Sequence, residues 1–192
     1  MNDKLLANVR FYFAQAVFNN NCHYKAYDRL KKKKTQVSYV VISISAITIV
    51  LLILQVIGLE QKIQSLLNIV AYLGMFSTAI SLILEIFNKE DKSEQILMHK
   101  IYAEKYKSLR DEYMSLIEEI MSHSIADDQL RTKKEVLQQR YSSIGEYAPE
   151  TNGDDYKQAQ IGLGLNGIGE EFTWSDVEIN KFLPQQLRLI IE

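Results

Sequence analysis

Two long uncharged stretches dominate the hydrophobic pattern of the chain. Thr35 to Leu59 are 25 residues without a charge, and Ile63 to Leu84 are 22 more. A helix needs roughly 20 apolar residues to cross a bilayer core of about 30 Å. Only residues 60–62 separate the stretches, and they follow Gly58, a residue type that commonly ends a helix. The pattern predicts two membrane-spanning helices joined by a tight turn, with both chain ends on one side.

A pair of buried helices in a soluble bundle is the alternative for these stretches. Soluble core helices rarely run this far without a charge, because one face of such a helix usually meets water. The pattern therefore favours an all-α membrane protein, with a transmembrane helical hairpin at 35–87. We expect an N-terminal amphipathic helix at 1–34 and a helical extension after the spans.

Small and polar residues recur on one face of each expected span, at 100° per residue. Such faces usually mediate packing between membrane helices. In an oligomer they could also line a water-filled path, and the pattern leaves both roles open. An ionisable residue in a span is a functional candidate by default. The candidate lining or packing residues are Ser45, Thr48, Gln55, Gln64, Asn68, Thr78, Ser81 and Glu85.

The segments on either side of the spans have helical periodicity. Residues 3–30 place Leu6, Val9 and Phe13 on one face, while the run at 19–21 of three Asn is a candidate break. The expected helix at 89–122 carries an apolar seam with spacings of 4, 3, 4, 3 and 4, the signature of a coiled coil. Half of the seam is Tyr, which tolerates partial exposure at an interface. The predicted oligomer or partner seam is Tyr102, Tyr106, Leu109, Tyr113, Leu116 and Ile120.

A second helix is expected to start at Asp127 or Asp128, either of which can cap it. It completes a cytoplasmic helical hairpin at 88–146 that packs against the N-terminal helix. Residues 147–192 contain most of the glycines and read as irregular structure, followed by a short C-terminal helix capped by Thr173 or Ser175.

The sequence contains no pattern that argues for catalysis. Gly162, Gly164 and Gly167 match a dinucleotide fingerprint, but no strand–helix–strand pattern surrounds them, so Asn166-Gly167 is better explained as a tight turn. The single cysteine excludes an internal disulfide, and the three histidines lie on different elements. We expect no enzyme activity, no metal site and no cofactor.

The charges are distributed asymmetrically. Residues 1–36 carry eight Lys/Arg against two Asp/Glu, and the remainder carries 14 against 22. Cytoplasmic flanks of spans are enriched in Lys/Arg, so both termini are expected in the cytoplasm. A basic cluster can also bind nucleic acid. Beside a span, anchoring to anionic lipid is favoured, and no direct nucleic-acid binding is expected. The cluster is Arg29, Lys31, Lys32, Lys33 and Lys34.

The order of these elements resembles a known family. A basic amphipathic helix, the lysine cluster, a tight two-span hairpin and a long Tyr-rich helix are similar to the SLATT proteins, two-transmembrane effectors of bacterial anti-phage conflict systems. The charged segment 85–99 after the second span resembles the corresponding transition in that family, as do 141–147 and 152–156. Where many members have Asn-His, this chain has Asn152-Gly153.

The resemblance implies an effector in the bacterial inner membrane that is encoded beside a sensor. The sensor would be a nucleotide-second-messenger synthase, a nucleotide-binding protein or a reverse transcriptase. On signal it would assemble pores or otherwise breach the membrane, so that the infected cell stops growing or dies. A homo-oligomer that responds to the sensor or to its nucleotide is the first expectation. A membrane scaffold that recruits a cytoplasmic partner and conducts nothing is the alternative.

Overall fold

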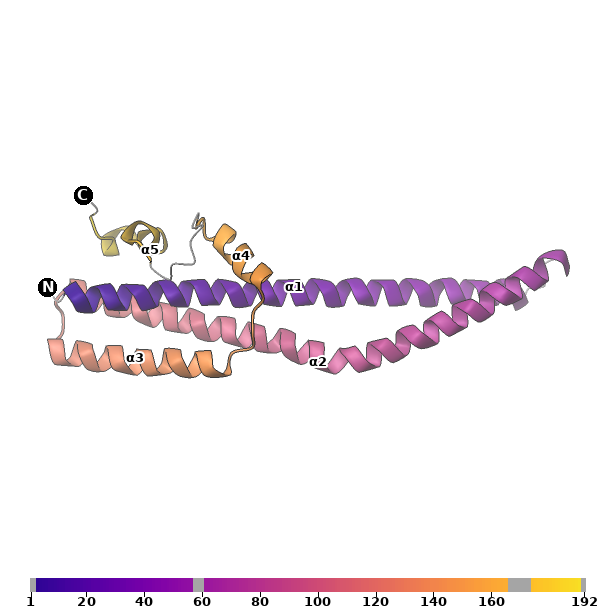
Figure 1. The fold of residues 1–192 in the computed structure, drawn as a ribbon, viewed down its shortest axis with the longest axis horizontal. Helices are drawn as coiled ribbons and strands as arrows, with labels where there is room; N and C mark the ends of the chain where they lie inside the picture. Colours follow the sequence, from indigo (N-terminus) through magenta and orange to yellow (C-terminus); the bar gives the residue numbers. More distant parts are fainter. Residues whose placement is uncertain (1–2, 57–60, 166–173, 191–192) are drawn as a thin grey trace. The chain divides into compact units, whose positions relative to one another are not determined.

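The computed structural model describes residues 3–56, 61–165 and 174–190, and side chains at 55–56, 61–63, 84–85 and 87–91 lie outside this description. Within these ranges every regular element is a helix, which confirms the predicted all-α class (Figure 1). The elements in chain order are α1 (Asp3–Val56), α2 (Gln61–Met121), α3 (Asp127–Tyr147), α4 (Gly153–Gly162), α5 (Asp176–Phe182) and the 3-10 helix η1 (Gln185–Leu187).

The chain divides into two compact units. The span unit is Arg29–Ile96, and the bundle unit combines Met1–Asp28 with Leu97–Glu192. The first and last segments of the sequence, expected as separate regions, thus form one unit. Because α1 and α2 each contribute to both units, each unit is described below by itself.

The bundle unit is built around an apolar core. Leu6, Val9 and Phe13 of α1 pack in one buried cluster with α2, α3 and the end of the chain. In this unit α3 lies alongside α2, whereas α4 and α5 lie along α1 (Figure 1). The predicted helical hairpin packed against the N-terminal helix is therefore present.

The run of asparagines does not interrupt α1, contrary to the candidate break. Asn20 is buried, and its Nδ2 donates to the carbonyl of Ala103 at 2.7 Å. Asn19 Nδ2 donates to the hydroxyl of Tyr141 at 2.8 Å. Asn is a weak helix former because its side chain competes for backbone groups. Here two of these side chains are engaged by neighbouring helices instead, so tertiary contacts outweigh the local preference.

Two other local predictions were wrong. Neither Asp127 nor Asp128 caps α3, whose N-cap is Ala126; both carboxylates lie in the first turn, where they favourably face the helix dipole. The segment after residue 147 is not all irregular, since α4 begins with a capping box between Asn152 and Asp155. The predicted box at Ser175 is confirmed, with Glu178 as its partner.

Candidate functional site

The inner face of the span unit centres on two threonines. Thr48 Oγ1 of α1 lies 3.1 Å from Thr78 Oγ1 of α2. Thr48 also donates to the carbonyl of Ile44 at 2.9 Å. A hydroxyl has one proton, so Thr78 is the donor between the two threonines. Hydrogen bonds between membrane helices stabilise their association by only about 0.6 kcal/mol on average.

Small residues bring the two spans close together at this contact. A Cβ added to Gly74 would lie 3.0 Å from Thr48 Oγ1, closer than side chains normally approach. Ala71, one turn earlier, is 2% exposed. Small residues allow such close backbone approach in membranes, where dispersion forces and hydrogen bonds hold helices together.

The predicted stripe is on the less exposed side of the spans. Thr48 is buried, and Ser45, Gln64, Asn68, Thr78 and Ser81 are half-buried. The side chains of Gln55 and Glu85 lie outside the description. Large apolar side chains point outward instead, for example Phe76 at 68% exposure. The roles of the stripe in lining or packing stay predictions, and none of its described members is exposed.

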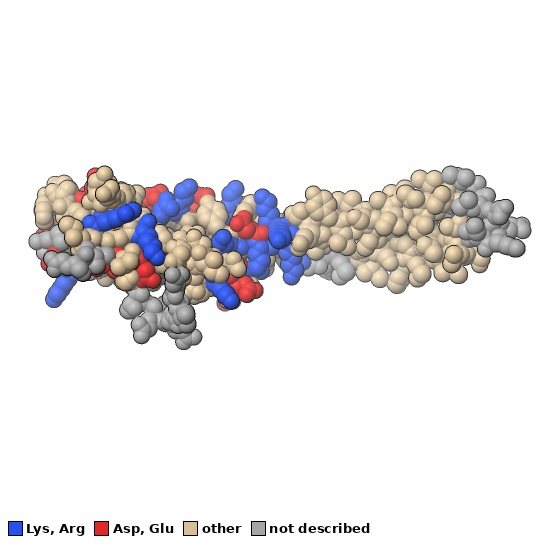
Figure 2. All heavy atoms as spheres, turned by 90° about the horizontal axis from the view of Figure 1, so that it is seen from above, with Lys and Arg blue, Asp and Glu red and all other residues tan. Residues whose placement is uncertain are grey.

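The basic cluster lies at the start of the span unit, next to the first uncharged stretch. Lys31, Lys32 and Lys33 are exposed, while Lys34 Nζ donates to Ser93 Oγ at 2.8 Å. Figure 2 shows Lys and Arg side chains gathered at one end of a long surface without charged residues. Lipid anchoring by Arg29 and these lysines fits this position, and it remains a prediction.

The predicted oligomer seam is the core of the bundle unit. Its six residues are between 0% and 5% exposed and pack against α1 and α3 of the same chain. In this fold they offer no surface to a partner, so the assembly role is corrected to a core role. A seam that packs within one chain can have the same period and the same tyrosine content as a seam between chains. The sequence alone therefore does not distinguish an intramolecular bundle from an oligomer.

A buried pair of histidines went unpredicted. His23 Nδ1 and His99 Nδ1 lie 3.1 Å apart, and the His23 ring stacks on Tyr106 at 5.5 Å between centroids. Burial, with a smaller contribution from His99, lowers the pKa of His23 to about 4, although the Asp155 charge opposes the shift. His23 is therefore neutral at pH 7, and in its contact with His99 one ring nitrogen donates and the other accepts.

The neighbouring Cys22 has no reactive character. It is buried, and burial together with the charge of Asp155 raises the pKa of its thiol to about 12. The thiolate is the nucleophilic form, so this side chain is inert at neutral pH.

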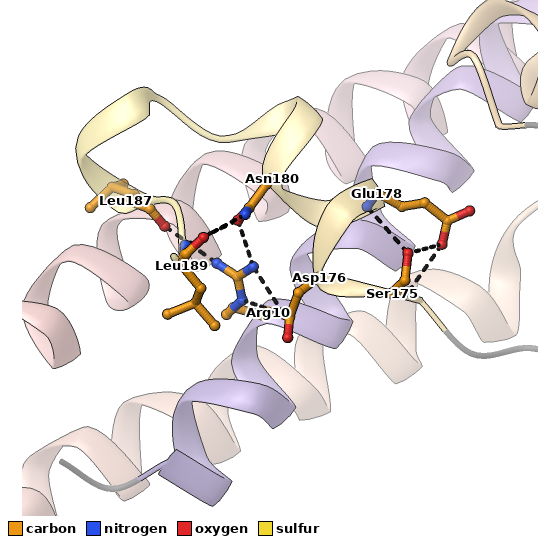
Figure 3. Close-up of polar contacts among 7 residues, drawn as sticks. All are labelled: Arg10, Ser175, Asp176, Glu178, Asn180, Leu187 and Leu189. Atoms are coloured by element: carbon orange, nitrogen blue, oxygen red, sulfur yellow. Dashed lines mark hydrogen bonds and ion pairs between the residues drawn. The ribbon is translucent and has the colours of Figure 1, made fainter. Parts of the chain in front are cut away.

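Arg10 holds the end of the chain on α1. The side chain is 0% exposed, and its Nη2 donates to Asn180 Oδ1 at 2.8 Å and to Asp176 Oδ1 at 3.1 Å (Figure 3). Nη1 donates to the carbonyl of Leu187 at 3.3 Å. Asn180 in turn pairs with both backbone groups of Leu189. One buried cation thus organises the C-terminal segment, residues 174–190.

This arrangement was also missed by sequence reasoning. The partners of Arg10 are more than 160 positions away, and no local spacing connects them. The only available signal was an arginine on the apolar face that also carries Leu6 and Phe13. In the same segment Leu187 and Leu189 pack on the core, whereas Ile190 is 96% exposed.

Within the described residues, no three His, Cys, Asp or Glu side chains gather as a metal site. Gly164 of the glycine motif has a φ of 63° in a turn after α4, while Asn166-Gly167 lies outside the description. The expectations of no catalysis, metal or cofactor stay predictions.

Fold and exposure together define a helical membrane protein with two spans. Both candidate helices are long and apolar enough to cross a bilayer, and only 11% and 6% of their most apolar stretches are buried. Core helices of a soluble bundle would be mostly buried, so the alternative of a soluble protein fails.

The family is also shown. The family model described as SMODS and SLOG-associating 2TM effector domain, family 4, matches residues 5–178. The chain belongs to this family, as the resemblance to the SLATT proteins implied, and is a membrane-type effector domain associated with those conflict systems. No curated protein and no solved structure is significantly similar to the chain.

Proposed function

We propose that this protein is a homo-oligomeric effector of bacterial anti-phage defence that opens a path through the inner membrane when signalled. The signal is a sensor protein encoded beside it, or that sensor's nucleotide product, and the outcome is growth arrest or cell death. One observation carries the proposal: Thr48 and Thr78 meet between the two spans, and the other described residues of the predicted stripe are half-buried. Polar groups retained inside a membrane commonly serve transport as well as packing.

The orientation follows from the basic cluster. Three exposed lysines at 31–33 border the first span, which favours a cytoplasmic position next to anionic lipid. Because α1 ends at Val56 and α2 begins at Gln61, the two spans run in opposite directions in this proposal, and both termini lie in the cytoplasm together with the bundle unit. A signal from a cytoplasmic sensor reaches the bundle unit directly in this orientation.

Assembly must use a surface other than the seam. The seam residues are buried in their own chain, whereas the spans expose large apolar side chains such as Tyr39, Phe76 and Ile86. We assign contacts between copies to these outward faces of the spans.

The decisive experiment measures ionic current and dye leakage in proteoliposomes, with and without the neighbouring sensor and its product. The conducting protein should respond to the signal, and replacement of Asn68, Thr78 and Ser81 by Leu should abolish the current. A matched control replaces the exposed Ile69, Ile80 and Ile83 by Leu, which introduces three leucines and keeps the outward faces apolar. Silence of inserted, oligomeric protein under every condition would contradict the proposal.

A non-conducting scaffold that recruits a cytoplasmic partner is the second candidate. It is favoured by the same contact, because Thr48 and Thr78 are hydrogen-bonded to each other within the hairpin. The Leu triple variant separates the two functions. A scaffold should still recruit its partner to the membrane when the inner face is made apolar, and it should protect cells as well as the parent protein does.

A further inference from the structure

The described polar side chains of the spans divide between an exposed side and a less exposed side. Apart from tyrosines, the exposed polar residues among the described side chains between 37 and 83 are Ser43, Ser65 and Ser77. The amides and the two central threonines are buried or half-buried. A water-filled path needs polar groups along its wall. The resting hairpin offers few of them outward, so its inner face is the richer source.

Among the described side chains, Thr48 and Thr78 close the inner face by direct contact. Thr48 Oγ1 and Thr78 Oγ1 are 3.1 Å apart. Gly74 has no side chain, and the space that a Cβ would take there is next to Thr48. We propose that the two spans of one chain part along this contact when the path opens, so that the residues packing the resting hairpin line the open state. This inference rests on the proposed function and adds how the path is gated.

Membrane physics makes such a separation accessible. Lipid tails are as apolar as leucine, so no hydrophobic driving force holds the two spans together. What the contact loses on parting is a threonine pair and close packing of small residues, and water entering the path can replace the hydrogen bond. A signal that binds the parted state better than the closed one then shifts the population.

A reversible disulfide tests the proposal. Thr48→Cys with Thr78→Cys places two thiols where the hydroxyls are already in contact, within reach of disulfide geometry. Native Cys22 is buried and inert, so it can remain. Thiol titration and mass analysis confirm the bond within one chain. Thr48→Cys alone is one control, and Ser43→Cys with Ser77→Cys, both exposed, is the matched pair on the outer face.

Under signal, the oxidised double variant should conduct no more than protein-free vesicles, and reduction should restore the current of the parent. If the fully oxidised variant still carried the full signalled current, the proposal that the spans part would be wrong. The proposed function as a pore would still stand. Failure of the disulfide to form in the resting protein would also overturn it, because the closed contact is its premise. If reduced variant and parent are both silent, the proposed function fails, and the gating falls with it.

Gly74→Ala tests the same contact from the opposite direction. The added methyl group meets Thr48 Oγ1 at 3.0 Å and should wedge the spans apart, raising dye leakage without signal several-fold. Thr48→Ala in the same chain removes the obstructing hydroxyl and should return leakage to the parent level. Unchanged leakage in Gly74→Ala, from protein that inserts and assembles normally, would contradict the proposal.

Discussion

The two units differ in the size of the side chains they bury. In the bundle unit many of the fully buried side chains are large and apolar or aromatic, such as Leu109, Tyr113 and Ile117, all at 0% exposure. Among the described side chains of the span unit the buried residues are the small Ala71 and Thr48, while Phe76 is 68% exposed. In water, burial of apolar area stabilises a fold by about 25 cal/mol per Å². In lipid that term vanishes between helices, and close packing of small residues takes its place.

The first prediction compares a leucine from each unit. Leu109→Ala removes a fully buried side chain and should lower the free energy of unfolding of the bundle unit by about 2–5 kcal/mol. Leu73→Ala, at a position 62% exposed on a span, should change it little. Thermal unfolding in detergent, followed by near-ultraviolet circular dichroism, measures both. Equal losses would mean that the two units do not differ as described.

The second prediction uses pH to weaken only the bundle unit. The folded pKa of His23 is about 4, below its usual 6.5, so the unfolded chain binds more protons between these values. Stability from this group is complete above pH 6.5 and falls as the pH drops toward 4, by about 3 kcal/mol at most.

Unfolding of the parent and of His23→Gln should be compared from pH 7 to pH 4. The variant has no titrating imidazole at this position and should lose less stability across that range. Parallel pH profiles would show that His23 is not buried in its neutral form.

The third prediction concerns the C-terminal segment of the bundle unit. Arg10→Leu removes donors to Asn180, Asp176 and Leu187 and should destabilise the segment by about 2 kcal/mol, because hydrogen bonds from charged donors are among the stronger ones. Hydrogen exchange of the amides at 179–189 should accelerate. In Asp176→Asn the lost partner is 55% exposed, and the change should be below about 1 kcal/mol. If Asp176→Asn destabilised the segment more than Arg10→Leu does, Arg10 would not be the residue that holds the segment on α1.

The smallest effect is expected in the spans. Thr78→Val keeps the shape but removes the donor to Thr48, and the hairpin should lose about 0.6 kcal/mol, the average for such bonds between membrane helices. The midpoint of unfolding in mixed micelles reports this change, with Ser77→Ala, on the exposed side, as the control. A loss as large as that of Leu109→Ala would argue that the span pair is stabilised like a soluble core.

The spans were predictable because length and lack of charge are sufficient to define them. The 25 and 22 uncharged residues satisfy the bilayer requirement whatever they contact. The capping box at Ser175 was equally readable, since it depends on residues three positions apart. The capping box at Asn152 also depends on residues three positions apart. It was missed because the glycine content of this segment favoured irregular structure.

The function of the seam could not be inferred from its period. A 3.5-residue repeat states that a helix face is buried, and it does not state whether the partner belongs to the same chain. The His23–His99 contact joins positions 76 apart, and the contacts of Arg10 join positions up to 177 apart. Only folding of the bundle brings these groups together.

The sequence by itself determined that the protein crosses a membrane twice, because a helix in lipid must satisfy its backbone internally and present apolar side chains to its surroundings. Those are properties of single segments. Only the tertiary structure decided which polar groups meet: Thr48 with Thr78, His23 with His99, and Arg10 with the end of the chain. Each pair depends on distances between helices, which are set by the packing of many side chains at once.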